Sequence, residues 1–82
     1  MSKKEKLIRE FMSSSAKNKT YRDLITLANY LHLEVIQGYG SNFKLVDKNG
    51  RVILQLHRKD NDSTFLNYEI KIIRKMIEEV DK

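Results

Sequence analysis

The chain has 82 residues, of which 40% are hydrophobic and 33% charged, with a formal net charge of +5 at pH 7 and no cysteine or proline. This length allows one small domain with one core, and the composition excludes an intrinsically disordered chain and a disulfide-linked one. No apolar run reaches the roughly 18 residues that span a bilayer, and no signal peptide pattern follows the basic N-terminus, so we expect a cytoplasmic protein with no membrane partner.

The positive charge is concentrated near the N-terminus. Residues 1–19 hold six basic and two acidic side chains, a balance of +4, whereas the other 63 residues hold ten basic and nine acidic ones, a balance of +1. A basic arm can contact phosphates, but a run of charges is also typical of a solvated helix face. Charge alone therefore leaves nucleic-acid binding as one of two open interpretations.

Two amphipathic helices are predicted first. Apolar residues recur at helical spacing over residues 3–13, before a serine cluster. Thr20, three residues before Asp23, predicts the N-cap of a second helix that continues to about His32. A histidine at a helix C-terminus is explained by the helix dipole, so we assign His32 no function.

Three strands are predicted next, because the apolar period changes to two. The first begins at Leu33 and ends near Gly38, where Gly38-Tyr39-Gly40 predicts a turn. The second carries Phe43 and Leu45 on its apolar face. The third runs from about Arg51 to His57.

Asn49-Gly50 predicts a tight hairpin between the second and third strands, because both residues readily adopt positive φ values. With a two-residue loop, the residue numbers of paired residues sum to 99. A four-residue loop would shift the partners by two positions without moving any side chain to the other face. The apolar face then carries Phe43 opposite Leu56 and Leu45 opposite Leu54, with Val52 beside them. The other face carries Asn42 opposite His57, Lys44 opposite Gln55 and Val46 opposite Ile53.

A final helix is predicted to begin between Thr64 and Tyr68. Its apolar stripe comprises Leu66, Ile70, Ile73, Ile77 and Val80, widened by Phe65, Ile72 and Met76. The order of elements predicts an α+β fold of two layers, in which helices pack on one face of a three-stranded antiparallel sheet and the other face is solvated.

Over nearly its whole length the chain resembles the HicA family of toxin-antitoxin ribonucleases. The similar segments are Lys3-Lys4-Glu5-Lys6-Leu7, Thr20-Tyr21-Arg22-Asp23-Leu24, Gly40-Ser41, Leu56-His57-Arg58, Tyr68-Glu69-Ile70 and Ile73-Arg74. The resemblance implies an α-β-β-β-α core like the double-stranded-RNA-binding domain over residues 20–82, with a basic helix and loop over residues 1–19, all in one folded unit. It also implies cleavage of messenger RNA in active members until a HicB-type antitoxin binds.

The residues that would carry catalysis depart from the family pattern. Many members place a catalytic histidine after Gly-Ser, but this chain has Asn42, which cannot act as a general base. Other members carry a histidine, a basic residue, proline, histidine and proline after the third strand. Here His57 matches the first histidine, Asp60 replaces the second, and both prolines are missing. His57 is thus the candidate catalytic residue, and a surface histidine at a strand end is the simpler interpretation.

An RNA-binding surface is predicted around this histidine. Its candidate residues are Tyr39, Ser41, Asn42, Lys44, Gln55 and Arg58. Lys44 and Arg58 would neutralise phosphate, and Tyr39 is a better candidate than Tyr68 for stacking on a base. The same residue types also occur on any solvated sheet face. Neither a metal nor a cofactor is expected, because two distant histidines do not form a ligand set and no glycine-rich phosphate loop is present.

Three functions follow as expectations. The first is a HicA-like RNA-binding protein, in its active form a metal-independent endoribonuclease toxin neutralised by a HicB-type antitoxin. The alternative is an inactive HicA-like protein of a phage or other mobile element, which captures an antitoxin as a decoy or inhibits another nucleic-acid enzyme. The third is DNA binding through the two N-terminal helices, for which strong salt dependence on duplex DNA is the expected signature.

Overall fold

Four helical segments and one sheet make up the fold of the computed structural model, which describes residues 2–37, 42–57, 60 and 62–80. The helical segments are α1 (Lys3–Met12), the short 3₁₀ helix η1 (Ser14–Asn18), α2 (Tyr21–Tyr30) and α3 (Asn67–Val80). The strands are β1 (Glu34–Gln37), β2 (Asn42–Val46) and β3 (Val52–His57). They form an antiparallel sheet in the order β1-β2-β3. The predicted α+β class and element order are confirmed.

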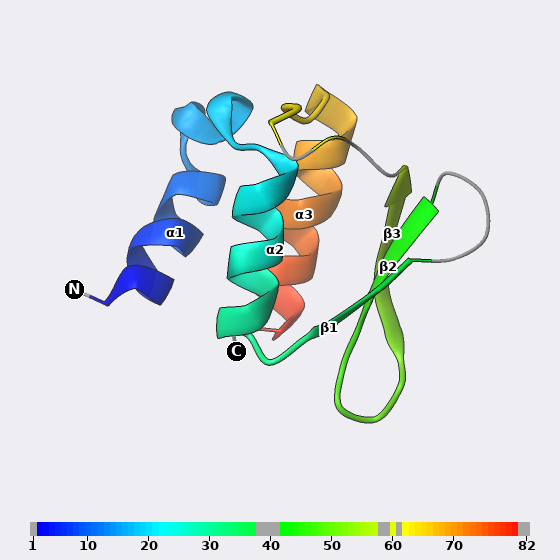
Figure 1. The fold of residues 1–82 in the computed structure, drawn as a ribbon. Coiled ribbons are helices and arrows are strands. Elements are labelled where there is room, and N and C mark those ends of the chain that lie inside the picture. Colours follow the sequence, from blue (N-terminus) through cyan, green and yellow to red (C-terminus); the bar gives the residue numbers. More distant parts are fainter. Residues whose placement is uncertain (1, 38–41, 58–59, 61, 81–82) are drawn as a thin grey trace.

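The helices lie on one side of the sheet (Figure 1). α2 contacts β1 and α3 contacts β3, while α1 packs against α2 and α3 on the side away from the strands. Side chains from all these elements meet in one core. The largest fully buried ones are Phe11, Leu24, Leu27, Phe43, Leu45, Glu69, Ile73 and Met76. Residues 1–19 therefore join the same core as the rest of the chain, through Leu7, Phe11 and Ala16.

The start of α2 is fixed by the predicted cap. The Thr20 hydroxyl accepts the Asp23 N–H at 3.4 Å, and the Asp23 carboxylate accepts the Thr20 N–H at 2.9 Å. These two bonds form a capping box, which satisfies backbone donors that the first turn of a helix leaves unpaired. Thr20 also forms an isolated bridge with Thr64, which ties this helix start to the segment before α3.

The end of α2 differs slightly from the prediction. The helix ends at Tyr30 with Leu31 as its C-cap, and His32 lies beyond it with φ 61°. The Leu33 N–H donates to the Ala28 carbonyl at 2.8 Å, and the His32 N–H donates to the Asn29 carbonyl at 3.2 Å. This is a Schellman arrangement, with histidine at the left-handed position where glycine is usual. It turns the chain directly into β1.

The hairpin between β2 and β3 matches the predicted register along most of its length. Pairs from Asn42 opposite His57 to Leu45 opposite Leu54 sum to 99 as expected. Nearer the turn the prediction was wrong, because Val46 pairs with Val52 and leaves Ile53 as the extra residue of a bulge.

The physical reason for the bulge lies in the turn. The Gly50 N–H donates to the Asp47 carbonyl, the Asp47 N–H donates to the Arg51 carbonyl, and Gly50 has φ +82°. This is a three-residue loop, not the predicted two-residue one, and its last residue is left-handed. Because the loop is one residue longer, Val52 is 48% exposed instead of lying in the core, and Ile53 packs against the core.

The predicted stripe of α3 was partly wrong. Ile70, Ile73, Met76 and Ile77 are buried as expected, but Leu66 and Ile72 are 56% and 40% exposed. In their place the helix buries Glu69, whose Oε1 accepts the Leu66 N–H at 2.8 Å. Leu66 therefore serves as the backbone start of the helix, which is why its side chain lies outside the stripe.

Candidate functional site

The polar cluster predicted from the hairpin register lies on the outer face of the sheet, which we define as the face turned away from α2 and α3. Phe43, Leu45, Leu54 and Leu56 are buried in the core that the sheet shares with the helices. Since side chains alternate along a strand, the residues between them point the other way.

Two rows of paired residues form the polar part of this face. Asn42 pairs with His57, and Lys44 pairs with Gln55 on one side and with Ile36 of β1 on the other. Gln55 and His57 are exposed, whereas Asn42 and Lys44 are half-buried. The predicted set is thus brought together, with Ile36, 40% exposed, as an apolar neighbour that the prediction did not include.

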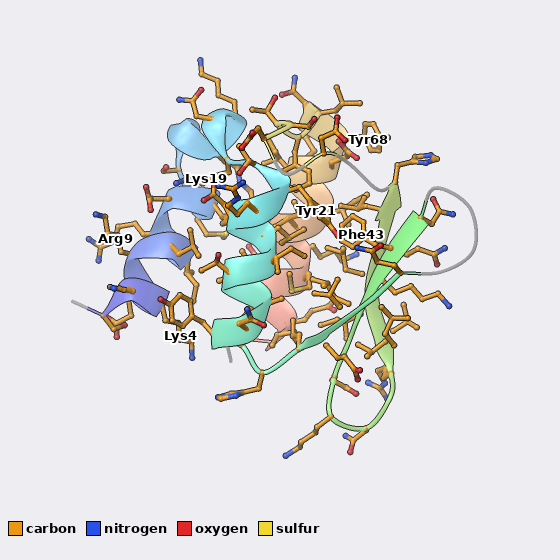
Figure 2. All side chains as sticks on the ribbon, in the orientation of Figure 1. Lys4, Arg9, Lys19, Tyr21, Phe43 and Tyr68 are labelled. Carbon is orange, nitrogen blue, oxygen red and sulfur yellow. The ribbon has the colours of Figure 1, made fainter. Side chains whose placement is uncertain are left out.

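The polar rows continue into a hollow beside α3. This hollow, about 360 Å³ in volume, is lined by Asn42, Gln55, Leu56, His57, Tyr68 and Ile72. Figure 2 shows the Tyr68 side chain projecting from the start of α3, at the end of the molecule where β3 also ends. The site therefore lies at the edge of the sheet, where polar residues of β2 and β3 and the start of α3 line the same hollow.

Tyr68 is the functional candidate that sequence reasoning placed second. Its ring is 53% exposed, although it lies only one residue from the buried Glu69. The signal was present in the sequence, because Tyr68 falls outside the apolar stripe of the helix. What could not be read from the sequence was that α3 would place this ring against the end of β3.

His57 lacks the surroundings of a positioned catalytic base. Its side chain is exposed, and within the described residues the structure gives it no hydrogen bond and no ion pair. A base of this kind normally needs a second group that orients its ring. The geometry supports binding at this position more directly than it supports proton transfer.

Three predicted site residues lie outside the described part of the chain. They are Tyr39, Ser41 and Arg58, together with the Gly38-Tyr39-Gly40 turn. The candidate site consequently rests on the hollow and on the two polar rows.

The basic excess of residues 1–19 lies apart from this surface. Figure 2 shows Lys4 and Arg9 on α1, on the opposite side of α2 from the sheet. Lys19 forms an ion pair with Glu10 at 2.9 Å, which fastens the segment after η1 to α1. Most of these cations therefore cannot contact a short ligand seated beside Tyr68.

A larger hollow, of about 640 Å³, lies between the end of α2 and the β2–β3 turn. Its lining mixes apolar, acidic and basic residues, namely Ile25, Asn29, His32, Leu33, Glu34, Val35, Asp47, Lys48 and Gly50. The Asp47 carboxylate is already engaged, because its Oδ1 accepts the N–H groups of Asn49 and Arg51, both at 2.9 Å. We therefore interpret this hollow as part of the turn and not as a ligand site.

Metal and membrane features are not found in the described ranges. No group of three or more metal-ligating side chains is gathered among the residues that the structure describes. None of the helices described is long and apolar enough to cross a membrane.

Comparison with protein-family models, with curated proteins and with solved structures finds no match for this chain.

Proposed function

We propose that this chain is a HicA-like RNA-binding protein of the cytoplasm that holds unpaired bases in the hollow between β3 and α3. The observation that carries the proposal is the meeting of Tyr68 with Asn42, Gln55 and His57 around one hollow. Unstacked RNA bases are recognised by aromatic stacking and by hydrogen bonds to their edges. An amide side chain offers both donors and an acceptor for those edges.

The charge of the chain agrees with a polyanionic ligand. The net charge of +5 attracts nucleic acid over distance, and Lys44 lies beside the base-contacting residues on the outer face. Single-stranded RNA is favoured over a duplex, because a hollow of about 360 Å³ with one exposed ring suits a base that has left its stack.

Binding can be tested with fluorescently labelled RNA and anisotropy. Tyr68→Ala is expected to weaken affinity for single-stranded RNA about 5- to 150-fold, since one stacked base is worth about 1–3 kcal/mol. Tyr68→Phe should retain most of the affinity, because it keeps the ring. Leu66→Ala is the matched control, since Leu66 is equally exposed at the same helix start but does not line the hollow. Equal losses in Tyr68→Ala and Leu66→Ala would contradict the proposal.

A catalytic form of this function would cleave RNA without a metal. The RNA 2′-hydroxyl would attack the adjacent phosphorus, and the bond from phosphorus to the 5′-oxygen would break. His57 would assist the proton transfer, with Lys44 and Arg58 neutralising phosphate. The products would be a 2′,3′-cyclic phosphate and a free 5′-hydroxyl, and a HicB-type antitoxin would be the natural inhibitor.

This catalytic form has its own experiment. Labelled RNA incubated in chelator should yield the cyclic-phosphate product with the native chain, and RNA with a 2′-deoxy sugar at the cleaved position should resist. His57→Ala should abolish both cleavage and toxicity to growing cells. Full cleavage and toxicity in that variant would rule out His57 as the catalytic group.

The second candidate function is a non-catalytic binding or interference protein of a phage or other mobile element. It is favoured by Asn42, which stands where many HicA members have their histidine, and by the absence of an orienting partner for His57 among the described residues. It predicts no cleavage of any RNA, together with stable capture of a protein partner, which would be an antitoxin or another nucleic-acid enzyme.

A further inference from the structure

We propose that a second hollow, between η1 and α3, binds the phosphate backbone of the same RNA strand. This inference rests on the RNA binding proposed above and adds the path of the strand. The hollow measures about 280 Å³ and is lined by Ala16, Lys17, Asn67, Ile70, Lys71 and Arg74. Figure 1 shows η1, the start of α3 and the end of β3 at the same end of the molecule.

The lining of this hollow has one sign of charge. Three of its six residues are cationic and none is acidic. Lys19 with Glu10 and Arg22 with Asp62 form ion pairs among the described residues, and neither pair includes a residue that lines this hollow. Lys17 and Lys71 are both exposed, so an arriving anion would not need to displace a carboxylate. Like charges held at one place favour an anion between them.

Arg74 is held in place before any ligand arrives. Its Nε donates to the Phe11 carbonyl at 2.9 Å and its Nη2 donates to the Ser13 carbonyl at 2.8 Å. A guanidinium has five N–H groups, so three remain for another acceptor. A fixed, planar guanidinium suits phosphate oxygens better than a mobile ammonium does.

The spacing of residues on α3 joins the two hollows. Tyr68 and Ile72 line the first hollow, while Asn67 and Lys71 line the second. The two residues of each pair are four positions apart and so lie on one stripe of the helix surface. The two stripes are neighbours. A strand whose base stacks on Tyr68 would only have to cross from one stripe to the next for its phosphates to reach Lys71 and Lys17.

A single RNA strand fits both hollows at once, with a base in the first and its phosphodiester backbone in the second. Phosphate oxygens accept hydrogen bonds from lysine and arginine without regard to base sequence, so this contact would position the strand and leave base recognition to the first hollow. An acidic peptide would satisfy the cations but would leave the amide groups and the ring of the first hollow unused.

Salt dependence tests the proposal directly. Affinity for single-stranded RNA should be measured over a series of salt concentrations for Lys17→Gln, Lys71→Gln and the double variant. Each lost phosphate contact lowers the slope of log affinity against log salt by about 0.7 for a single strand, so the double variant should lose about 1.4. Lys48→Gln is the matched control, because it removes the same charge from an exposed position in the distant β2–β3 turn.

The possible outcomes separate this inference from the function it rests on. Support requires that Lys17→Gln and Lys71→Gln reduce the slope, that Lys48→Gln does not, and that Tyr68→Ala lowers affinity with the slope kept. An unchanged slope in the double variant, with Tyr68→Ala still weakening binding, would overturn the phosphate hollow and leave the proposed function standing. An equal reduction of the salt slope in Lys48→Gln and Lys71→Gln would also overturn the phosphate hollow. Absence of RNA binding by the native chain would overturn both, as would polyglutamate that competes as well as RNA does.

Discussion

Tyr21 and Phe43 pack edge to face, with ring centroids 5.0 Å apart and planes at 77°, and so join the start of α2 to the middle of the sheet. Both rings are buried, but the Tyr21 hydroxyl has no hydrogen-bond partner among the described residues. A buried polar group without a partner costs roughly 1–3 kcal/mol of desolvation. The ring contact therefore stabilises the fold while the hydroxyl opposes it.

Tyr21→Phe is expected to raise the free energy of unfolding by about 1 kcal/mol, because it keeps the ring and removes the unpaired hydroxyl. For a domain of this size the midpoint of thermal unfolding should rise by about 4–8 °C. Tyr68→Phe, which removes a hydroxyl from an exposed ring, should leave the midpoint unchanged. A lower stability of Tyr21→Phe would show that the hydroxyl has a partner in solution.

His32→Gly should stabilise the chain by about 1 kcal/mol. A residue with a side chain pays roughly 1–2 kcal/mol in the left-handed conformation, and glycine avoids most of that cost even after its larger entropy in the unfolded state. His32 has φ 61° and is exposed, so little packing is lost. Asn29→Gly is the control, because Asn29 is exposed within the same helix and its replacement by glycine should lower the free energy of unfolding by about 0.3 kcal/mol. Urea unfolding of both variants gives the two signs.

Gly50→Ala is expected to lower the free energy of unfolding by about 1 kcal/mol through backbone conformation alone. A Cβ at this position would meet no atom within 4 Å, so a steric clash does not contribute. Gly50→Asn should lose less, because asparagine tolerates the left-handed region. If alanine and asparagine were equally destabilising, the positive φ of the turn would not be the cause.

Arg74→Met should loosen α1 more than the rest of the chain. The change removes two charge-assisted hydrogen bonds to the end of α1, for a loss of about 1–3 kcal/mol. Amide hydrogen exchange should accelerate most within α1. Lys75→Met is the control, since Lys75 is exposed on the neighbouring position of α3 and should leave the exchange of α1 unchanged. Uniform acceleration in Arg74→Met would instead indicate that α1 unfolds only with the whole domain.

The sequence predicted the elements well where one physical signal dominated. The period of apolar residues located all three α-helices and all three strands, and Thr20 with Asp23 located the start of α2. The turn around Asp47 and Gly50 was harder, because two- and three-residue loops favour the same asparagine and glycine. The one extra residue in the loop decides whether Val52 or Ile53 packs against the core.

The candidate site was predictable only in part for a related reason. Alternation along two strands was sufficient to bring Asn42, Lys44, Gln55 and His57 onto one face. Tyr68 depends on how α3 lies against β3, which no local pattern encodes. The basic hollow between η1 and α3 depends on the contact of these two helices, and about fifty positions separate Lys17 from the residues of α3 that line it.

The bonds from Arg74 to α1 also bear on the order in which the chain can fold as it is made. The ribosome releases Phe11 first, but Arg74, whose Nε donates to the Phe11 carbonyl, follows 63 positions later. A helix of 10 residues is marginal by itself in water. Throughout most of synthesis α1 therefore lacks the contact that completes its end, and its apolar face can pack against α2 but is covered on both sides only after α3 has been made.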